Sequence, residues 1–313
     1  MLILQLFLYF VSFFVIWYGA GLVVSVVDRL AHRLNLSSFA VSFFVLGILT
    51  SLPETTVGIS AIIDKKPEIF VGNLLGASLV LFIFVIPLLA VLGDGIKLAH
   101  QLDKKKLFFS LLVTAAPVFL VVDRQVSLYE GLFLIFIYGY LFYSIEKRKG
   151  LLERLKDQLL NHKGSVSFEV LKLLFGIVTI FLSSKFIVDQ TIYFSSVFKI
   201  SSFLLSLLFL SVGTNLPELS LAVRSVILGK KEVAFGDYVG SAAANTLIFG
   251  GLTIINGGEV LVANGFLKIL LFTLFGLALF FYFSRSKNDI SRHEGIILLL
   301  FYFLFFLTEI LTA

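Results

Sequence analysis

The 313-residue sequence predicts an all-α polytopic membrane protein whose ten transmembrane helices form two inverted five-helix repeats. The first supporting observation is composition, with 58% hydrophobic residues, only 14% charged residues and a mean hydropathy of +1.02. Ordinary soluble domains carry about 25% charged residues, so that class is excluded. The second is that the charges are clustered and leave apolar stretches near the roughly 20 residues that a membrane helix needs. The third is an internal repeat.

Ten apolar stretches lie between the charge clusters. They cover residues 2–27, 37–63, 69–93, 107–123, 127–145, 168–198, 201–228, 233–255, 264–284 and 294–312. The first stretch has no Lys or Arg before it and is long for the apolar region of a signal peptide. We therefore expect it to be a retained helix.

Positive charge alternates between the connections. The basic connections follow the odd-numbered spans and contain Arg29, Arg33, Lys97, Lys104, Lys105, Lys106, Lys147, Arg148, Lys149, Arg154, Lys156, Lys163, Lys230, Lys231, Arg285, Lys287 and Arg292. The other side holds little beyond Lys65, Lys66, Arg124 and Lys199. The positive-inside rule predicts that both termini lie outside and that the long central connection is cytoplasmic. We expect the membrane to be the plasma (cell) membrane. Topology thus explains the net charge of +5, and we expect the lipid bilayer, not nucleic acid, as the partner.

The repeat has a constant offset of 164 residues, which carries Ser37-Ser38-Phe39 onto Ser201-Ser202-Phe203. The same shift carries Ser42, Thr50, Pro53, Glu54, Glu68, Gly72 and Gly76 onto Ser206, Thr214, Pro217, Glu218, Glu232, Gly236 and Gly240. It moves the second span onto the seventh, and because five is odd, the two copies cross the membrane in opposite directions. Inverted repeats of this kind are typical of secondary transporters, which bind their substrate near the midplane between the repeats.

The repeat divides the chain into two domains. Residues 1–145 form the first five-helix repeat, with its motif region at 37–90, and residues 168–313 form the second, with its motif region at 201–255. The cytoplasmic connection, 146–167, places Leu151, Leu152, Leu155, Leu159 and Leu160 on one helical face. This pattern fits an amphipathic helix on the membrane surface, and a solvated tether is the alternative.

A glutamate lies in apolar sequence in each repeat. The motifs read Thr50-Ser51-Leu52-Pro53-Glu54 and Thr214-Asn215-Leu216-Pro217-Glu218. An ionisable residue at membrane depth costs about 2.5–3.5 kcal/mol on insertion scales, so it is a functional candidate. Each proline breaks its helix and frees carbonyl oxygens, which are tolerated where they line a cavity or meet a ligand. Two such motifs indicate a cation pathway.

The spans that follow these breaks open with glycine motifs. They read Gly72-Asn73-Leu74-Leu75-Gly76-Ala77-Ser78 and Gly236-Asp237-Tyr238-Val239-Gly240-Ser241. We expect the glycines to let spans 2 and 3, and spans 7 and 8, approach closely. Together with the glutamate motifs, this pattern resembles the two alpha-repeats of the cation/calcium exchanger superfamily, which includes sodium/calcium and proton/calcium exchangers. The resemblance covers nearly the whole chain.

The resemblance implies a set of cation ligands. Glu54 and Glu218 would be the central ligands, and hydroxyls and carbonyls at the breaks, around Thr50, Ser51, Thr214 and Asn215, would complete the sites. In the second repeat, Ser241 and Asn245 match the hydroxyl and the Asn or Asp that the family places one turn apart. The matching positions in the first repeat are Ala77 and Leu81, so half of the expected polar wall is missing.

The ligand set can be weighed against the chemistry of the ion. Calcium takes six to eight oxygens, and two carboxylates neutralise its charge. Glu54 and Glu218 supply up to four oxygens, and Asn245, Thr50, Thr214 and water can supply the rest. Ala77 weakens the sodium sites that the family would place nearby, whereas Ser78 points about 100° away around the helix. A proton-coupled cycle requires only that the glutamates take up protons when the metal leaves.

Other polar residues have structural alternatives. Asn73 and Asp237 either cap or brace the start of a helix or contact the ion. Ser241 and Asn245 could serve only as interhelical hydrogen-bonding groups. Lys185 and Asp189 are four residues apart in span 6, and we expect them to pair with each other near the outer surface.

These observations favour a secondary antiporter that exchanges calcium, or a similar divalent cation, for sodium or protons. The resemblance implies that spans 1 and 6 slide past a fixed core formed by the other spans. The alternative is a channel-like or sensing protein that binds the cation without coupled exchange. An embedded enzyme is a third possibility, but the chain has no His-rich metal motif, nucleophile elbow or cysteine. We therefore expect no enzymatic activity and no cofactor, only the transported Ca²⁺ and Na⁺ or H⁺.

Overall fold

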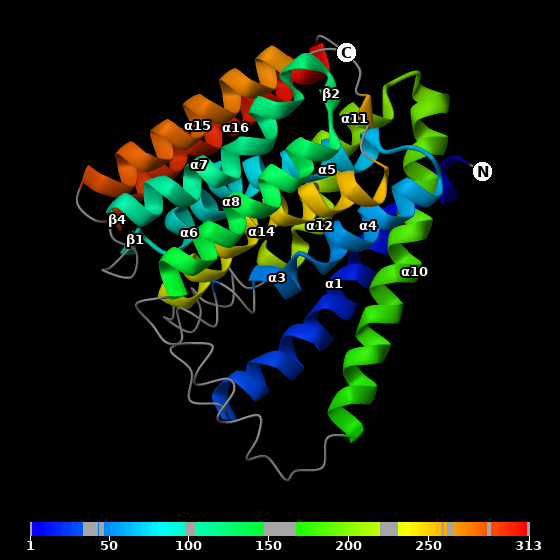
Figure 1. Cartoon of the computed structure of the whole chain (residues 1–313), viewed down its shortest axis with the longest axis horizontal. Helices are drawn as coiled ribbons and strands as arrows, with labels where there is room; N and C mark the ends of the chain where they lie inside the picture. Colours follow the sequence, from blue (N-terminus) through cyan, green and yellow to red (C-terminus); the bar gives the residue numbers. More distant parts are fainter. Residues whose placement is uncertain are drawn as a thin grey trace.

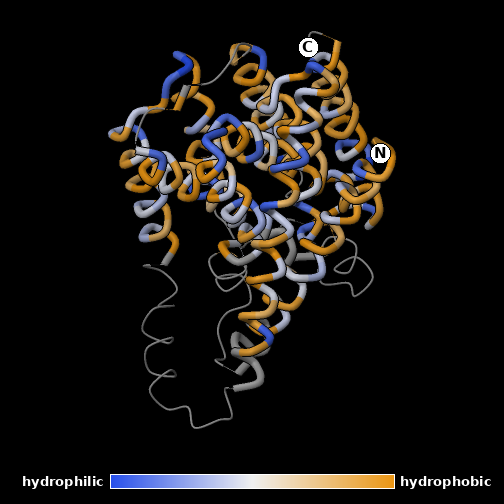
Figure 2. Tube along the Cα trace, turned by 90° about the vertical axis from the view of Figure 1, so that its right-hand side faces the viewer, coloured by the Kyte–Doolittle hydropathy of each residue, from blue (hydrophilic) through white to orange (hydrophobic). Residues whose placement is uncertain are grey.

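The computed structural model describes residues 2–33, 43, 47–97, 104–146, 167–219, 231–257, 260–261, 266–286 and 289–311. Within these ranges, eight helical segments are long and apolar enough to cross a membrane. They comprise α1 (Leu2–Arg33), α5 (Glu68–Val80) continued by η2 (Leu81–Val85) and α6 (Ile86–Leu92), α7 (Lys104–Leu120), α8 (Leu128–Glu146), α10 (Ser167–Phe198), α14 (Lys231–Ile255), α15 (Phe266–Ser286) and α16 (Arg292–Leu311). The prediction of an all-α polytopic membrane protein is confirmed at this level. Hydrophobic residues dominate along the helices (Figure 2).

The two motif spans are interrupted helices. The first consists of α3 (Gly47–Thr50) and α4 (Leu52–Ile63), which are separated at Ser51. The second consists of α11 (Ser202–Leu205), η4 (Ser206–Leu210) and α12 (Ser211–Thr214), followed by a turn at Asn215 and helical residues 216–219. Each break therefore precedes the predicted Leu-Pro-Glu position by one residue. The reason is that proline is tolerated in the first turn of a helix, so the new helix begins before it.

Four two-residue strands join the halves of the chain. β1 (Ile96–Lys97) pairs antiparallel with β4 (Asp289–Ile290), and β2 (Gln125–Val126) pairs antiparallel with β3 (Val260–Leu261). The offset of 164 residues carries β1 onto β3 and β2 onto β4. Each strand of the first half is thus paired with a strand of the second half. These pairings fix the two halves against one another.

The motif spans pack across the halves. α14 packs on α3, α7 and α8, and α5 packs on α11, η4 and α12. α1 and α10 pair with each other and run out from one side of the bundle (Figure 1). Gly19 and Gly176 face each other in this pair. A Cβ on Gly19 would lie 3.1 Å from the Gly176 carbonyl oxygen, and a Cβ on Gly176 would lie 2.9 Å from that of Gly19.

The bounds of several predicted elements differ from those of the structure. The predicted surface helix in the central connection lies outside the described residues, as do Ser37, Ser38 and Ser42. α1 extends beyond its predicted end to Arg33. α5 begins at Glu68 and α14 at Lys231, so the Gly72 and Gly236 motifs lie inside these helices and do not open them. Glycine inside a helix is unfavourable, but at these positions it allows close packing of neighbouring helices.

Candidate functional site

Both motif glutamates are buried at the start of a helical segment. Glu54 lies in the first turn of α4 and is 1% exposed, and Glu218, in the helical residues after Asn215, is fully buried. Each carboxylate folds back toward its own backbone N–H group. The partial positive charge of a helix N-terminus favours an acidic side chain at this position. The proline breaks therefore create two places inside the bundle where a carboxylate can be held.

The two motifs exchange contacts. The hydroxyl of Thr214 approaches the carboxylate of Glu54, and the hydroxyl of Thr50 approaches the carboxylate of Glu218. The two carboxylates also lie within electrostatic range of each other. Each glutamate is thus contacted by the threonine hydroxyl of the other half. The structure brings the two predicted motifs together into one site between the halves.

A chain of short contacts links α3, α14 and Glu218. Ser241 Oγ lies 3.1 Å from Glu218 Oε1 and 2.9 Å from Ser51 Oγ, and Ser51 Oγ donates to the Gly47 carbonyl at 2.9 Å. The two hydroxyls carry two protons for three contacts. With Ser241 donating to Glu218 and Ser51 donating to Gly47, the contact between the two hydroxyls has no proton of its own.

Three asparagines surround the glutamates. Asn215 Nδ2 donates to the Ser211 carbonyl at 2.6 Å, which leaves its Oδ1 without a hydrogen-bond partner. Asn73 Oδ1 accepts from Thr214 at 3.2 Å. Asn245, on α14, is buried with neither amide atom hydrogen-bonded. The interhelical alternative for Asn245 thus has no contact to support it in this structure, whereas Ser241 does bond across helices.

Five buried oxygens in the site have no hydrogen-bond partner of normal geometry. They are Glu54 Oε1, Glu54 Oε2, Glu218 Oε2, Asn215 Oδ1 and Asn245 Oδ1. An unpaired buried oxygen is costly and demands an explanation. Carboxylate and amide oxygens are the ligands that hard cations such as calcium take. Among the described residues, no group of three or more His, Cys, Asp or Glu could hold a metal. The five oxygens come from two carboxylates and two amides.

The first half contributes less to the polar wall, as the sequence predicted. Ala77 and Leu81 are fully buried, and the Ser78 hydroxyl donates to the Leu74 carbonyl in its own helix at 3.1 Å. The polar contribution of α5 comes instead from Asn73. The idea that Asn73 caps a helix is wrong, because α5 begins five residues earlier, and its bond to Thr214 makes it a brace. Asp237 also lies within α14 rather than at its start, and its side chain is outside the described residues.

The motif glycines pack against a different partner from the one expected. A Cβ on Gly240 would collide with the Phe43 carbonyl, and one on Gly47 would lie 2.7 Å from the Ser241 nitrogen. On α5, a Cβ on Gly72 or Gly76 would collide with the carbonyl of Phe203 or Leu207. These contacts join the two halves, and not spans 2 and 3 or 7 and 8.

One positioning contact was not anticipated. Pro117 lies inside α7 and has no N–H, so the carbonyl of Val113 loses its helical partner. The hydroxyl of Thr246, on α14, donates to this carbonyl at 2.9 Å. Thr246 is adjacent to Asn245, so the contact fixes α14 beside the site. The sequence offered little to predict this contact. It shows only a proline inside one apolar span, Pro117, and a threonine in another, Thr246.

Comparison with known proteins agrees with this architecture. The sequence model of the sodium/calcium exchanger protein family matches residues 4–145 and 168–311 of the chain. The inner membrane protein YrbG of Escherichia coli (strain K12) is 26% identical over 259 residues, which cover 80% of this chain and 79% of that protein. The sodium/calcium exchanger MaX1 of Methanosarcina acetivorans is 22% identical over 329 aligned residues, with coverage of 92% and 93%. The solved structure of the sodium-calcium exchanger NCX_Mj has the same fold, with a TM-score of 0.68, 22% identity and coverage of 97% of this chain and 98% of its own.

Proposed function

Because the chain belongs to the sodium/calcium exchanger family, we propose that it is a secondary antiporter, which exchanges calcium or a similar divalent cation for sodium or protons by alternating access. The observation that carries this proposal is the set of unpaired buried oxygens around Glu54 and Glu218. A divalent cation would satisfy these oxygens and neutralise both carboxylates. Thr50, Ser51, Thr214, Asn215, Ser241 and Asn245 would supply further oxygens or orient them, with Asn73 as a brace.

The transport cycle requires that some helices rearrange around a site shared by the two halves. We assign residues 1–145 and 168–313 to two five-helix repeats of opposite orientation, joined by residues 146–167, which gives ten transmembrane helices with both termini outside. The reciprocal pairing of β1 with β4 and of β2 with β3 supports this assignment. The equivalent capping bonds from Ser127 to Glu130 and from Ser291 to Glu294, both 2.8 Å, support it as well. With two inverted repeats, a site between the halves would lie where alternating access needs it.

The coupling ion is either sodium or the proton. Sodium requires additional oxygen ligands, and the two buried positions at Ala77 and Leu81 offer none from their side chains. Protons require only the two carboxylates. The same protein can be tested with both driving forces, so the two cases are separable in one preparation.

The decisive experiment is calcium flux in proteoliposomes under an imposed sodium gradient and, separately, under a pH gradient. Exchange should be lost in Glu54→Gln and in Glu218→Gln. Glu309→Gln is a matched control, because Glu309 is also a buried carboxyl in a membrane helix but pairs with Lys268 at 3.4 Å, outside the site. Wild-type exchange in both site variants would refute the proposal. Flux that runs only down the calcium gradient, indifferent to sodium and pH, would support the channel-like alternative.

A further inference from the structure

α4 and α10 are joined by polar contacts that take no part in the candidate site. α10 packs on α1 and on α4. Thr56 of α4 and Ser184 of α10 place their hydroxyl oxygens 2.7 Å apart, and both residues are buried. Thr56 is two residues beyond Glu54 on the same helix. The contact therefore couples the helix that carries a candidate ligand to its neighbour α10.

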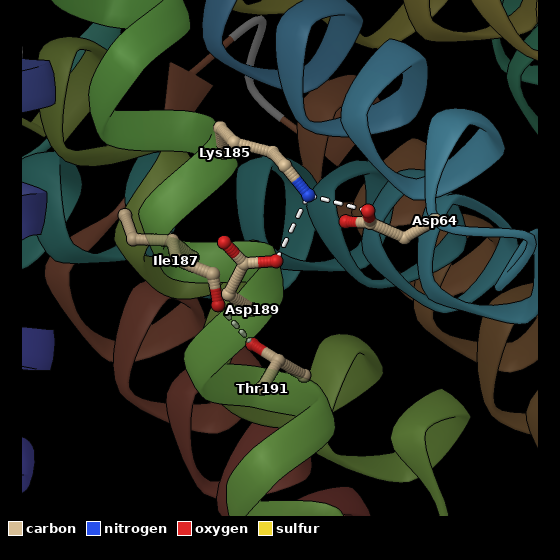
Figure 3. A network of polar contacts seen from close by, with 5 residues as sticks. All are labelled: Asp64, Lys185, Ile187, Asp189 and Thr191. Atoms are coloured by element: carbon tan, nitrogen blue, oxygen red, sulfur yellow. Dashed lines mark hydrogen bonds and ion pairs between the residues drawn. The ribbon is translucent and has the colours of Figure 1, made fainter.

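A charged cluster follows toward the end of α4. Lys185, adjacent to Ser184, forms an ion pair with Asp64 and a second one with Asp189 at 2.9 Å. Figure 3 shows the lysine amine between the two carboxylates. The expected pairing of Lys185 with Asp189 is thus confirmed, and Asp64 adds a partner from another helix. The side chains of Lys185 and Asp64 are 37% and 19% exposed, so water reaches this cluster.

The position of Asp64 explains why it needs a cation. Asp64 is the C-cap residue of α4, where the partial negative charge of the helix end disfavours a carboxylate. Lys185 compensates for both charges. The offset of 164 residues places Gly21 and Ser25 at the positions of α1 that correspond to Lys185 and Asp189. The charged cluster therefore belongs to α10 and has no counterpart on α1.

We propose that these residues, Thr56, Asp64, Ser184, Lys185 and Asp189, form a latch that holds α10 against α4 and opens during each exchange cycle. This inference rests on the proposed function, because alternating access requires some helices to move past others. A shift of α10 along α4 breaks both the Thr56–Ser184 contact and the Asp64–Lys185 pair. Lys185 keeps Asp189 as a partner on its own helix when the latch opens. The charge of Lys185 therefore stays paired when the latch opens, so opening is reversible.

The latch can be tested by cross-linking because the chain contains no cysteine. In the variant Thr56→Cys/Ser184→Cys, the new sulfurs replace two oxygens that already face each other, so an oxidant should form a disulfide. Calcium exchange should fall at least tenfold on complete oxidation and recover on reduction. Full exchange in the completely cross-linked protein would overturn the proposal. The reduced protein reports the proposed function separately, because a protein that does not exchange in either state refutes that function and not the contact.

Two further variants keep the test sharp. Ile96→Cys/Ile290→Cys joins the paired strands β1 and β4, and its cross-link should leave exchange unchanged. If Thr56→Cys/Ser184→Cys does not fold, Asp64→Cys/Lys185→Cys bridged by a short bifunctional thiol reagent gives the same readout at the more exposed end of the latch. Inhibition by this bridge supports the latch, and undiminished exchange in the bridged protein refutes it.

A measurement without transport completes the test. The rate of disulfide formation in Thr56→Cys/Ser184→Cys reports how often the two helices are docked. Adding Lys185→Gln should slow it about two- to fivefold, since a partly exposed ion pair has a modest effect. Adding Lys268→Gln, at an ion pair between other helices, should not change it. An equal cross-linking rate with and without Lys185 would show that the charged cluster does not hold the helices together.

Discussion

Ser51 and Ser241 come from opposite halves of the chain and place their hydroxyl oxygens 2.9 Å apart inside the candidate site. Ser51 occupies the break between α3 and α4, and Ser241 lies one turn before Asn245 on α14. Ser241 also donates to Glu218. The pair thus couples the broken helix of one half to the glutamate of the other.

We expect Ser241→Ala to weaken calcium binding. It removes the hydrogen bond to Glu218 and the contact to Ser51, and a hydrogen bond to a charged group is worth about 1.5–3 kcal/mol. The apparent affinity for calcium should fall at least roughly tenfold, as measured from the calcium dependence of flux. Ser78→Ala is the matched control, because its hydroxyl bonds only within its own helix. Equal affinities in the two variants would argue against a role for Ser241.

The substitution Ala77→Ser/Leu81→Asn should increase sodium-driven exchange relative to proton-driven exchange. It restores a hydroxyl and an amide at the first-half positions that match Ser241 and Asn245, and additional oxygens favour sodium. The ratio of the two fluxes in the same proteoliposomes should rise several-fold. Ala115→Ser, a buried position on α7, controls for the addition of a hydroxyl to a membrane helix. An unchanged ratio would mean that these positions do not set the coupling ion.

Gly240→Ala should destabilise the protein strongly. Its new methyl group would collide with the backbone carbonyl of Phe43, which cannot rotate away. Overpacking typically costs about 1–3 kcal/mol, and a contact between two backbones leaves little room for relief. Gly139→Ala on α8 is the control, because its Cβ would meet nothing within 4 Å. Thermal unfolding in detergent should show a lower Tm for Gly240→Ala alone, and equal Tm values would contradict the close packing.

Much of this molecule follows from local sequence. Hydropathy located the eight long apolar helices of the described residues, and the two prolines indicated the breaks beside Glu54 and Glu218 to within one residue. Tertiary partners were less predictable. The glycine motifs predict close packing within each half, but Gly72 and Gly240 contact the other half. A small residue indicates close packing without identifying the neighbour. The glycine motif suggests a helix start at Asn73, but α5 begins at Glu68, so Asn73 lies inside the helix.

Long-range polar contacts were the least predictable. Lys185 and Asp189 were paired correctly because a spacing of four residues is a local signal on a helix. Asp64 is separated from Lys185 by 121 residues, and no spacing rule reaches that far. The same holds for the pair Thr56 and Ser184. Such contacts depend on how the halves pack.

The bond between Thr246 and the Val113 carbonyl gives a test with an internal rescue. Thr246→Val keeps the shape of the side chain but leaves the carbonyl that Pro117 freed without a partner. An unsatisfied buried carbonyl costs about 1–3 kcal/mol, so the Tm should fall clearly. Thr253→Val should have a much smaller effect, because its hydroxyl bonds to the Phe249 carbonyl within α14.

Pro117→Ala restores an N–H that can bond to the Val113 carbonyl within α7. In that background, Thr246→Val should lose most of its destabilising effect, so the double-mutant cycle should show a coupling energy of about 1 kcal/mol or more. Additive effects of the two substitutions would mean that Thr246 does not act through the freed carbonyl. Because Asn245 is the next residue toward the site, Thr246→Val should also lower the apparent calcium affinity, and Pro117→Ala should not restore it. Rescue of the Tm without rescue of the calcium affinity would show that Thr246 has two separate effects. It pairs the Val113 carbonyl, and it anchors α14 beside the site.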